Sequence, residues 1–523
     1  MAEIETNVLY FGDNLEILRN RDYFPDGSVD LIYLDPPFNS QANYNKIFNE
    51  PGGRQSQAQI RAFDDTWDWG SDTAGEALRQ LGDSPYAEVA RLIRWLAGRG
   101  GSSSTSMAAY LSMMGVRLVE LRRVLKPTGS IYLHCDPTAS HYLKLLMDAV
   151  FEARNFRNEI IWKRTSGHSD AQRYGRVHDV VLFYTKTSRP EWNLTYQPYD
   201  EAYVNQYYRY QDPDGRKWMS DNLSASGLSG GGYDYEWKGI RRVWRCPRTT
   251  MERLEQEGRL FYTRKGMPRL KRYYDESKGL PVQDVWTDIE ALRSWHQERL
   301  GYPTQKPEAL LERIIEASSN EGDVVLDPFC GCRTAIIAAH RLKRRWIGID
   351  VTYLAIDLVE ERLQRTFPES SQGAYEIHGQ PRDETSARRL MEHRNKEFEI
   401  WAVSLVGAHP RQRDGGVDGV YTLVEGRTER KVSKVIVQVK GGKNLNPGMV
   451  RDLLGTLEKE SAVIGLLITL EAPTRGMREL AAHSGSYRSP VTGLEYPRIQ
   501  IRTIAELVEQ GNKFELPPGR RPS

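Results

Sequence analysis

The chain has 523 residues, a formal net charge of +2 at pH 7, 39% hydrophobic residues and 27% charged residues. These values indicate a soluble globular protein of about three structural units with a real core, and the net charge does not by itself indicate nucleic-acid binding. The longest apolar stretch, residues 462–470, is far too short to span a bilayer, and the N-terminus has no apolar signal core. The four cysteines form no CxxC pair, which argues against a zinc site and favours a cytoplasmic protein with reduced thiols.

The first third of the chain alternates between strands and helices. Apolar, β-rich runs predict strands at residues 7–11, 29–34, 130–136, 158–162 and 178–186. Helices are predicted from residue 12, over 107–125, and again before residue 158. Residues 41–107 are polar and rich in Gly, Ser and Gln, so we expect an insertion with a mobile tip.

Residues 187–295 break this alternation and are crowded with Tyr, Trp, Gly and Arg. Between Arg241 and Tyr274, eleven Lys and Arg stand against three Glu, with aromatic residues interleaved. Basic side chains neutralise phosphates and aromatic rings stack on bases, so Arg241, Arg242 and Arg245 are candidate DNA contacts. The alternative is an ordinary solvated basic face.

The strand and helix alternation returns at residue 304. Helices are predicted over 304–319 and 334–342, and strands over 323–330 and 345–351. Such alternation is typical of a parallel, doubly wound α/β sheet. After residue 365 the sequence turns polar, which predicts a linker over 366–387 and a second, smaller α/β domain over 388–523.

The segment Asp35-Pro36-Pro37-Phe38 directly follows an apolar strand. An exocyclic amino group on a base is a poor nucleophile because its lone pair is delocalised into the ring. The Asp35 carboxylate and a backbone carbonyl of the stiff proline loop would accept hydrogen bonds from both of its hydrogens and free that lone pair. Phe38 offers a face on which a flipped base would stack. The alternative is a strand-ending turn without chemistry.

A second buried strand runs through Asp327 into a tight loop and then a helix that begins at Thr334. Doubly wound sheets bind nucleoside-like ligands at such strand ends. Asp350 ends the following strand, where an acid suits hydrogen bonding to ribose hydroxyls.

Together these motifs resemble the β class of DNA amino-methyltransferases, over residues 7–365. The resemblance implies a Rossmann-like, circularly permuted class I methyltransferase domain over residues 1–365, with a target-recognition region at about 187–295 and S-adenosylmethionine as cofactor. It implies a catalytic role for Asp35, Pro36, Pro37 and Phe38. It implies cofactor contacts by Asp13, Thr304, Lys306, Asp327, Phe329, Gly331, Thr334 and Asp350. Residues 178–184 look like the strand that helps to line the target-base pocket.

The function expected from this resemblance is methylation of N6 of adenine in double-stranded DNA, within a restriction-modification system. N4 of cytosine is the alternative target, although relatives that act on cytosine more often carry Ser where Asp35 stands. Arg333 stands where the family's FxGxGT loop has its second glycine. An inward guanidinium would repel the cofactor sulfonium, so a DNA-binding protein with an inactive methyltransferase site is the rival of another class.

The C-terminal unit carries a second set of polar residues. Glu399 lies on a predicted helix, Asp418 opens a predicted hairpin, and Gln438 and Lys440 lie on a predicted strand. This set resembles the Mrr-like form of the PD-(D/E)xK restriction-endonuclease fold. Asp418 and Gln438 would hold Mg²⁺, and Lys440 would orient the attacking water. The alternatives are an inactive fold kept for DNA binding and an unrelated α/β domain. We expect double-stranded DNA as the partner, no membrane, and a homodimer as one possibility.

Overall fold

The computed structural model describes residues 4–36, 72–98, 102–167, 174–225, 231–293, 296, 298, 305–331, 334–350, 353–367, 375–410, 417–425, 431–509 and 514–517. The chain divides into two compact units, a larger one of Met1–Asn193 with Asp284–Ser523 and a smaller one of Leu194–Gln283. Within the described part, no helix combines the length and the apolarity that crossing a bilayer requires.

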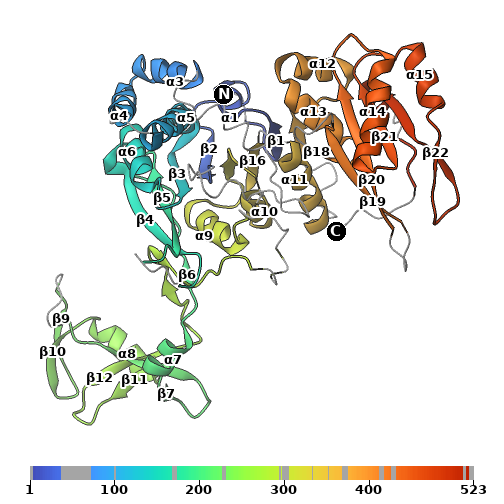
Figure 1. Ribbon diagram of the computed structural model, residues 1–523. Helices are drawn as coiled ribbons and strands as arrows, with labels where there is room; N and C mark the ends of the chain where they lie inside the picture. The colour runs from blue at the N-terminus through green and yellow to red at the C-terminus, as the bar shows by residue number, and fades with distance from the viewer. Residues whose placement is uncertain are drawn as a thin grey trace. The chain divides into compact units, whose positions relative to one another are not determined.

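A nine-stranded sheet organises the first part of the larger unit, in the order β14-β4-β5-β3-β2-β15-β16-β1-β17 (Figure 1). The strands are β1 (Val8–Phe11), β2 (Val29–Leu34), β3 (Leu125–Cys135), β4 (Phe156–Lys163), β5 (His178–Thr185), β14 (Val285–Trp286), β15 (Val324–Asp327), β16 (Arg345–Asp350) and β17 (Glu376–His378). Neighbouring strands are parallel except that β5 runs antiparallel to both β3 and β4. The expected parallel, doubly wound sheet is therefore confirmed in its main part, and β5 is its one antiparallel strand among the described residues.

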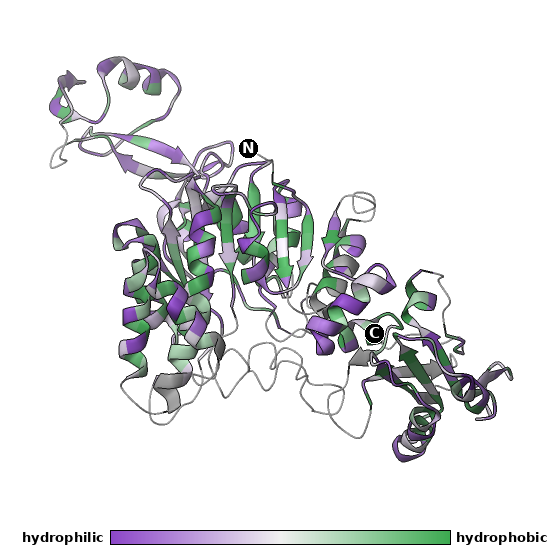
Figure 2. Ribbon diagram, turned by 90° about the horizontal axis from the view of Figure 1, so that it is seen from above, coloured by the Kyte–Doolittle hydropathy of each residue, from purple (hydrophilic) through white to green (hydrophobic). Residues whose placement is uncertain are grey.

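Helices cover both faces of this sheet. They are α1 (Asn14–Arg19), α3 (Asp72–Gly82), α4 (Ala87–Ala97), α5 (Ser102–Val124), α6 (Ser140–Phe151), the 3-10 turn η2 (Ala153–Asn155), α9 (Glu308–Ser318), α10 (Thr334–Arg341) and α11 (Tyr353–Thr366). Alternate strand residues point to opposite faces: Val8 and Tyr10 join the core formed with α1 and α3–α6, while Leu9 lies against α10 beside Gly348. Figure 2 shows the strands as largely hydrophobic between helices of mixed polarity.

Two predicted boundaries differ from the structure. Residues 41–107, expected to be a polar insertion, contain α3, α4 and the start of α5, and Val89 and Ile93 are fully buried. These helices are amphipathic, and their many polar residues led the segment to be interpreted as a polar insertion although one face of each helix is apolar. The expected linker, 366–387, contributes the edge strand β17, which pairs with β1.

The smaller unit has elements β6 (Tyr196–Gln197), α7 (Glu201–Tyr207), β7 (Tyr210–Gln211), β8 (Lys217–Asn222), β9 (Tyr233–Trp237), β10 (Ile240–Trp244), α8 (Arg248–Gln256), β11 (Leu260–Tyr262), β12 (Pro268–Tyr273) and β13 (Leu280–Pro281). A four-stranded sheet, β11-β12-β8-β7, and the hairpin β9–β10 enclose a small core around Trp237, Trp244 and Met251. The unit lies within the segment expected to read DNA.

The C-terminal part has a five-stranded sheet, β18-β19-β20-β21-β24. Its elements are α12 (Glu384–His393), α13 (Asn395–Ser404), β18 (His409–Pro410), β19 (Gly419–Glu425), β20 (Lys431–Lys440), α14 (Pro447–Glu460), β21 (Ile464–Thr469), α15 (Arg475–Ala482), β22 (Ser486–Arg488), β23 (Glu495–Pro497), β24 (Ile499–Thr503) and α16 (Ile504–Val508). Val437 of β20 packs in the core that contains α13, and Ile436 packs in the core that contains α14. The expected α/β architecture of this part is confirmed.

Candidate active sites

Acidic residues gather at one edge of the nine-stranded sheet. Strands β1, β2, β15 and β16 are parallel, so their carboxyl ends lie at the same edge. Asp327 and Asp350 end β15 and β16, while Asp35 follows β2 and Asp13 lies two residues beyond β1. Residues separated by more than 300 positions are thereby brought to one side of the sheet.

Asp35 forms an ion pair with Lys306, and their side chains are only 17% and 10% exposed. Lys306 lies just before α9, and its backbone oxygen accepts a hydrogen bond from the Thr334 hydroxyl at 3.1 Å. The predicted catalytic acid is therefore held by a residue that sequence reasoning assigned to the cofactor. Pro36 is buried beside Asp35. Pro37, Phe38, Thr304 and Arg333 lie outside the described residues.

The loop after β15 is built on two carboxylates. Asp327 accepts a hydrogen bond from the Phe329 amide at 3.1 Å, and Asp350 accepts one from the Gly331 amide at 2.9 Å. Gly331 has φ +25°, a backbone conformation that glycine adopts without cost. Burial raises the pKa of Asp327 well above its ordinary value, and the charges of Asp35 and Asp350 raise it further. A cation entering this edge would relieve that repulsion.

Asp13 has a role that the sequence did not predict. It caps α1 by accepting a hydrogen bond from the Leu15 amide at 2.7 Å, and both of its oxygens accept from Arg117, at 2.9 and 3.1 Å. Arg117 also donates to Asn14 at 2.6 Å, and Asn14 donates to the Pro328 carbonyl at 2.7 Å. This buried network ties the end of β1 to the loop after β15. The sequence feature that could have indicated this network is Arg117 itself, a single arginine within the apolar part of α5.

A second buried network lies on the other side of β2. The Nδ1 atom of His134 is 3.0 Å from the Tyr33 hydroxyl, and its Nε2 atom is 3.2 Å from an Asp179 carboxylate oxygen. Burial opposes ionisation of Asp179, but the hydrogen bond and charge of His134, with the charges of Arg164 and Lys306, lower its pKa. Sequence reasoning placed residues 178–184 at the target-base pocket without identifying His134, whose signal was a lone histidine in an apolar strand.

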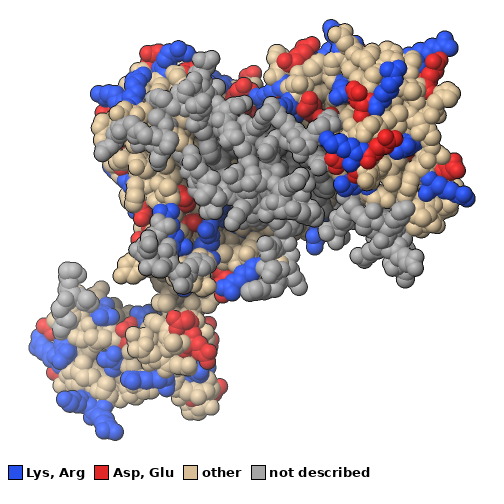
Figure 3. Space-filling view, viewed as in Figure 1, with Lys and Arg blue, Asp and Glu red and all other residues tan. Residues whose placement is uncertain are grey.

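The three predicted DNA-binding arginines do not share one surface. The register of the β9–β10 hairpin places Arg241 opposite Glu236 and Arg242 opposite Tyr235, so consecutive arginines point to opposite faces. Arg241 also pairs with Asp234 at 3.4 Å, and Arg245 donates to the Ser224 carbonyl at 3.1 Å. Figure 3 shows Lys and Arg side chains at the surface of the smaller unit.

The four predicted residues of the C-terminal domain lie on adjoining elements. Asp418, just before β19, accepts a hydrogen bond from the Val439 amide of β20 at 2.7 Å. Burial, together with the charge of Asp418, raises the pKa of Glu399 on α13 to about 7, while the charge of Lys440 opposes the shift. Burial also raises the pKa of Asp418, against the Val439 hydrogen bond and the charge of Lys440.

Gln438 and Lys440 line a cavity of about 500 Å³ between β20 and α14. Its other lining residues are Met449, Arg451, Asp452, Gly455, Thr456 and Lys459. Gly455 contributes to this opening because a Cβ atom there would have no neighbour within 4 Å. Neither Glu399 nor Asp418 lines this cavity, but the charge of Lys440, which does line it, lowers the pKa of both acids.

Comparisons with protein families match both parts of the chain. A model described as DNA methylase matches residues 29–361. A model described as NACHT-associated inactive Restriction Endonuclease 1 matches residues 401–509. The second match begins after Glu399.

Two curated relatives come from restriction-modification systems. The Type II methyltransferase M.EcaI of Enterobacter cloacae is 32% identical over 263 residues, which are 49% of this chain and 57% of the relative. The Type III restriction-modification enzyme StyLTI Mod subunit of Salmonella typhimurium is 29% identical over 354 residues, which are 64% of this chain and 50% of the relative. The chain thus spans little more than half the length of these relatives.

Solved structures that the comparison matched include the complex of M1.HpyAVI with S-adenosylmethionine, at 16% identity and a TM-score of 0.31, covering 68% of this chain and 98% of that one. The cytosine-N4-specific PvuII DNA methyltransferase has 14% identity and a TM-score of 0.30, covering 72% and 96% of the two chains.

Proposed function

The chain belongs to the DNA methylase family, and from this premise we propose that it transfers a methyl group from S-adenosylmethionine to N6 of adenine in double-stranded DNA, within a restriction-modification system. The observation that supports the proposal most directly is the position of Asp35. It lies at the carboxyl edge of the sheet, fixed by Lys306, beside the strand ends that carry Asp327 and Asp350.

The acids at this edge fit the cofactor by their chemistry. S-adenosylmethionine supplies the methyl group on a sulfonium, and it also presents an ammonium group and ribose hydroxyls. Asp327, Asp350, Gly331 and Thr334 would hold it. Burial, and after it the charges of Asp35 and Asp350, raise the pKa of Asp327, and a cation would relieve the part that comes from charge repulsion. The Asp13 carboxylate already forms an ion pair with Arg117. Asp13 would therefore position the loops of the site and would contribute less to binding the cofactor directly.

Asp35 would accept a hydrogen bond from the target amino group and so direct its lone pair away from the ring. Such an acceptor acts best when it is held before the substrate arrives. Lys306 provides that restraint from the start of α9. The network of Tyr33, His134 and Asp179 would hold the neighbouring wall of the base pocket rigid, because its polar atoms are already paired.

Adenine is proposed over cytosine because Asp35, and not Ser, stands in the catalytic segment. The rival of another class, a DNA-binding protein with a methyltransferase site inactivated by Arg333, predicts no cofactor binding. Titration calorimetry with S-adenosylmethionine separates the two. Expression in a methylation-free host, followed by sequencing with modification detection, then gives the modified base and its sequence context. A host genome without modification, from a protein that does not bind the cofactor, would favour the rival.

A second candidate function concerns the C-terminal domain. The matched family is described as inactive, yet this chain keeps Glu399, Asp418, Gln438 and Lys440 on adjoining elements. We propose that Asp418 and Gln438 hold a divalent cation, with the Glu399 carboxylate nearby, and that Lys440 orients water for cleavage of the DNA backbone. The full chain with Mg²⁺ should nick methylated or unmethylated DNA, and Lys440→Ala should stop it. Intact DNA of both kinds, bound by the protein, would support the inactive alternative.

A further inference from the structure

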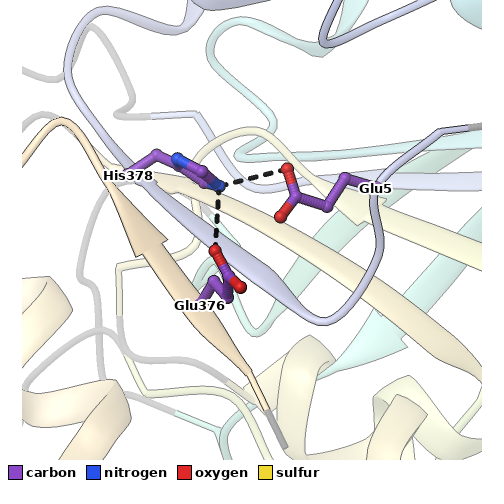
Figure 4. A group of neighbouring side chains, drawn as sticks. All are labelled: Glu5, Glu376 and His378. Atoms are coloured by element: carbon purple, nitrogen blue, oxygen red, sulfur yellow. Dashed lines mark ion pairs between the residues drawn. The ribbon is translucent and has the colours of Figure 1, made fainter.

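Three side chains with metal-binding atoms meet at the β17 edge of the nine-stranded sheet. Glu376 and His378 lie on β17, two residues apart and therefore on the same face, and Glu5 lies in the segment before β1. The register places His378 beside Tyr10 of β1. Figure 4 shows the His378 ring directed toward both carboxylates.

The spacing of these atoms fits shared ligands of one ion. The Nε2 atom of His378 is 3.1 Å from a Glu5 oxygen and 3.8 Å from a Glu376 oxygen, and one ligand atom from each residue lies within 4.8 Å of the others. Neighbouring ligands of a tetrahedral Zn²⁺, bound at about 2.0–2.1 Å, are separated by about 3.3 Å. Small side-chain rotations would bring the Glu376 oxygen to this distance.

The angles also distinguish this group from an ordinary histidine–carboxylate pair. Although the Glu5 oxygen is 3.1 Å away, the buried Nε2 atom of His378 makes no hydrogen bond with any described residue. The oxygen therefore lies to one side of the ring N–H direction, whereas a hydrogen bond would require it to lie along that direction. Ligands of one ion adopt this arrangement, because the ion occupies the direction of the nitrogen lone pair.

The histidine is oriented before any ion binds. Its ring stacks on Tyr10 with centroids 5.2 Å apart and planes 20° apart, and Tyr23 lies 6.1 Å away. The Tyr10 hydroxyl is buried and has no hydrogen-bond partner among the described residues. A water molecule bound to the ion would be a suitable partner for it.

We propose that Glu5, Glu376 and His378 bind a divalent transition-metal ion of the Zn²⁺ class, with water completing its coordination. The two carboxylates neutralise the charge of such an ion, and the imidazole favours it over Mg²⁺ or Ca²⁺. The bound ion fastens β17 to the segment before β1. The site is independent of the methyltransferase chemistry and of the candidate nuclease centre.

The test is a Co²⁺ titration of the full, tag-free chain after dialysis against a chelator. One equivalent should give visible d–d absorption without the thiolate charge-transfer bands of a cysteine site, and Zn²⁺ should abolish it. Thermal stability should rise with Zn²⁺ and not with Mg²⁺. The Glu376 side chain is 64% exposed, so Glu376→Gln should leave the fold intact. This variant should weaken Co²⁺ binding at least about tenfold.

His378→Gln should abolish the absorption, while His483→Gln, at an exposed histidine of the C-terminal domain, should retain it. Circular dichroism checks that each variant is folded. Absence of the d–d bands in the wild type, or equal bands in wild type and Glu376→Gln, would overturn the proposal and leave His378 as a partner in an ion pair.

Discussion

The ion pair between Asp35 and Lys306 joins residues 271 positions apart in the sequence and links the end of β2 to the start of α9. Because both side chains are largely buried, each charge depends on the other for its solvation. The pair therefore couples the proposed catalytic acid to the segment that would face the cofactor.

The first prediction concerns Asp35. Asp35→Asn should lower the methylation rate by at least about 10²-fold, because a neutral amide is a weaker acceptor for the target amino group. Affinity for S-adenosylmethionine should change by no more than a fewfold. The control is Asp22→Asn, at an exposed aspartate near α1. Wild-type turnover in Asp35→Asn would remove this residue from the mechanism.

The second prediction concerns the coupling of the pair. Lys306→Met or Asp35→Asn alone removes one charge of this largely buried ion pair and should destabilise the protein by about 3 kcal/mol. The double variant should be less destabilised than the sum of the two, with a coupling energy of about 1–3 kcal/mol in urea unfolding. Strictly additive changes would show that the pair contributes nothing to positioning Asp35.

The positions of the acidic residues at the strand ends could be predicted from the sequence, but the residues that contact them could not. Asp35, Asp327 and Asp350 each end an apolar run, and local patterning marks such ends. The partnership of Asp35 with Lys306 could not be predicted, because apolar patterning does not reveal which strands become neighbours. Arg117 and His134 were missed because each stands alone within an apolar segment.

The C-terminal residues show the opposite case. Asp418, just before β19, contacts the Val439 amide between Gln438 and Lys440, because β19 and β20 form one hairpin whose register is fixed by the short sequence separation. The protonation of such residues, in contrast, depends on how deeply each side chain is buried. Hydrophobic patterning gives the average burial of a segment and not that of one side chain. The raised pKa of Glu399 could therefore not be predicted from the sequence.

The third prediction follows from that pKa. Because burial raises the pKa of Glu399 from 4.5 to about 7, the native state retains this proton to a higher pH than the unfolded chain does. Stability should therefore fall as the pH rises through this window. Glu399→Gln should stabilise the domain at pH 8 by about 1 kcal/mol, a discounted value for a partly exposed group, and have little effect at pH 4.

Calorimetry of the full chain at both pH values measures this difference. The control is Glu392→Gln, at an exposed glutamate of α12. Equal stability of wild type and Glu399→Gln at pH 8 would contradict the burial that raises the pKa of this carboxyl.

The fourth prediction concerns the smaller unit. If it contacts DNA, Arg242→Gln should reduce the slope of log K against log salt by about one for each lost phosphate contact. Arg241→Gln and Arg245→Gln should have smaller effects, because Arg241 pairs with Asp234, while Arg245 donates to the Ser224 carbonyl and pairs with Asp221. Arg91→Gln, on α4 of the larger unit, serves as the control. Unchanged slopes in all three variants would place the DNA surface elsewhere.

The most direct test of the central claim is nucleoside mass spectrometry of unmethylated DNA incubated with the purified chain and S-adenosylmethionine. The account predicts N6-methyladenine that accumulates with time, requires the cofactor, and is lost in Asp35→Asn but not in Asp22→Asn. N4-methylcytosine in its place would contradict the proposed base. No methylated base from a folded chain that binds both DNA and the cofactor would contradict the proposed methyltransferase activity itself.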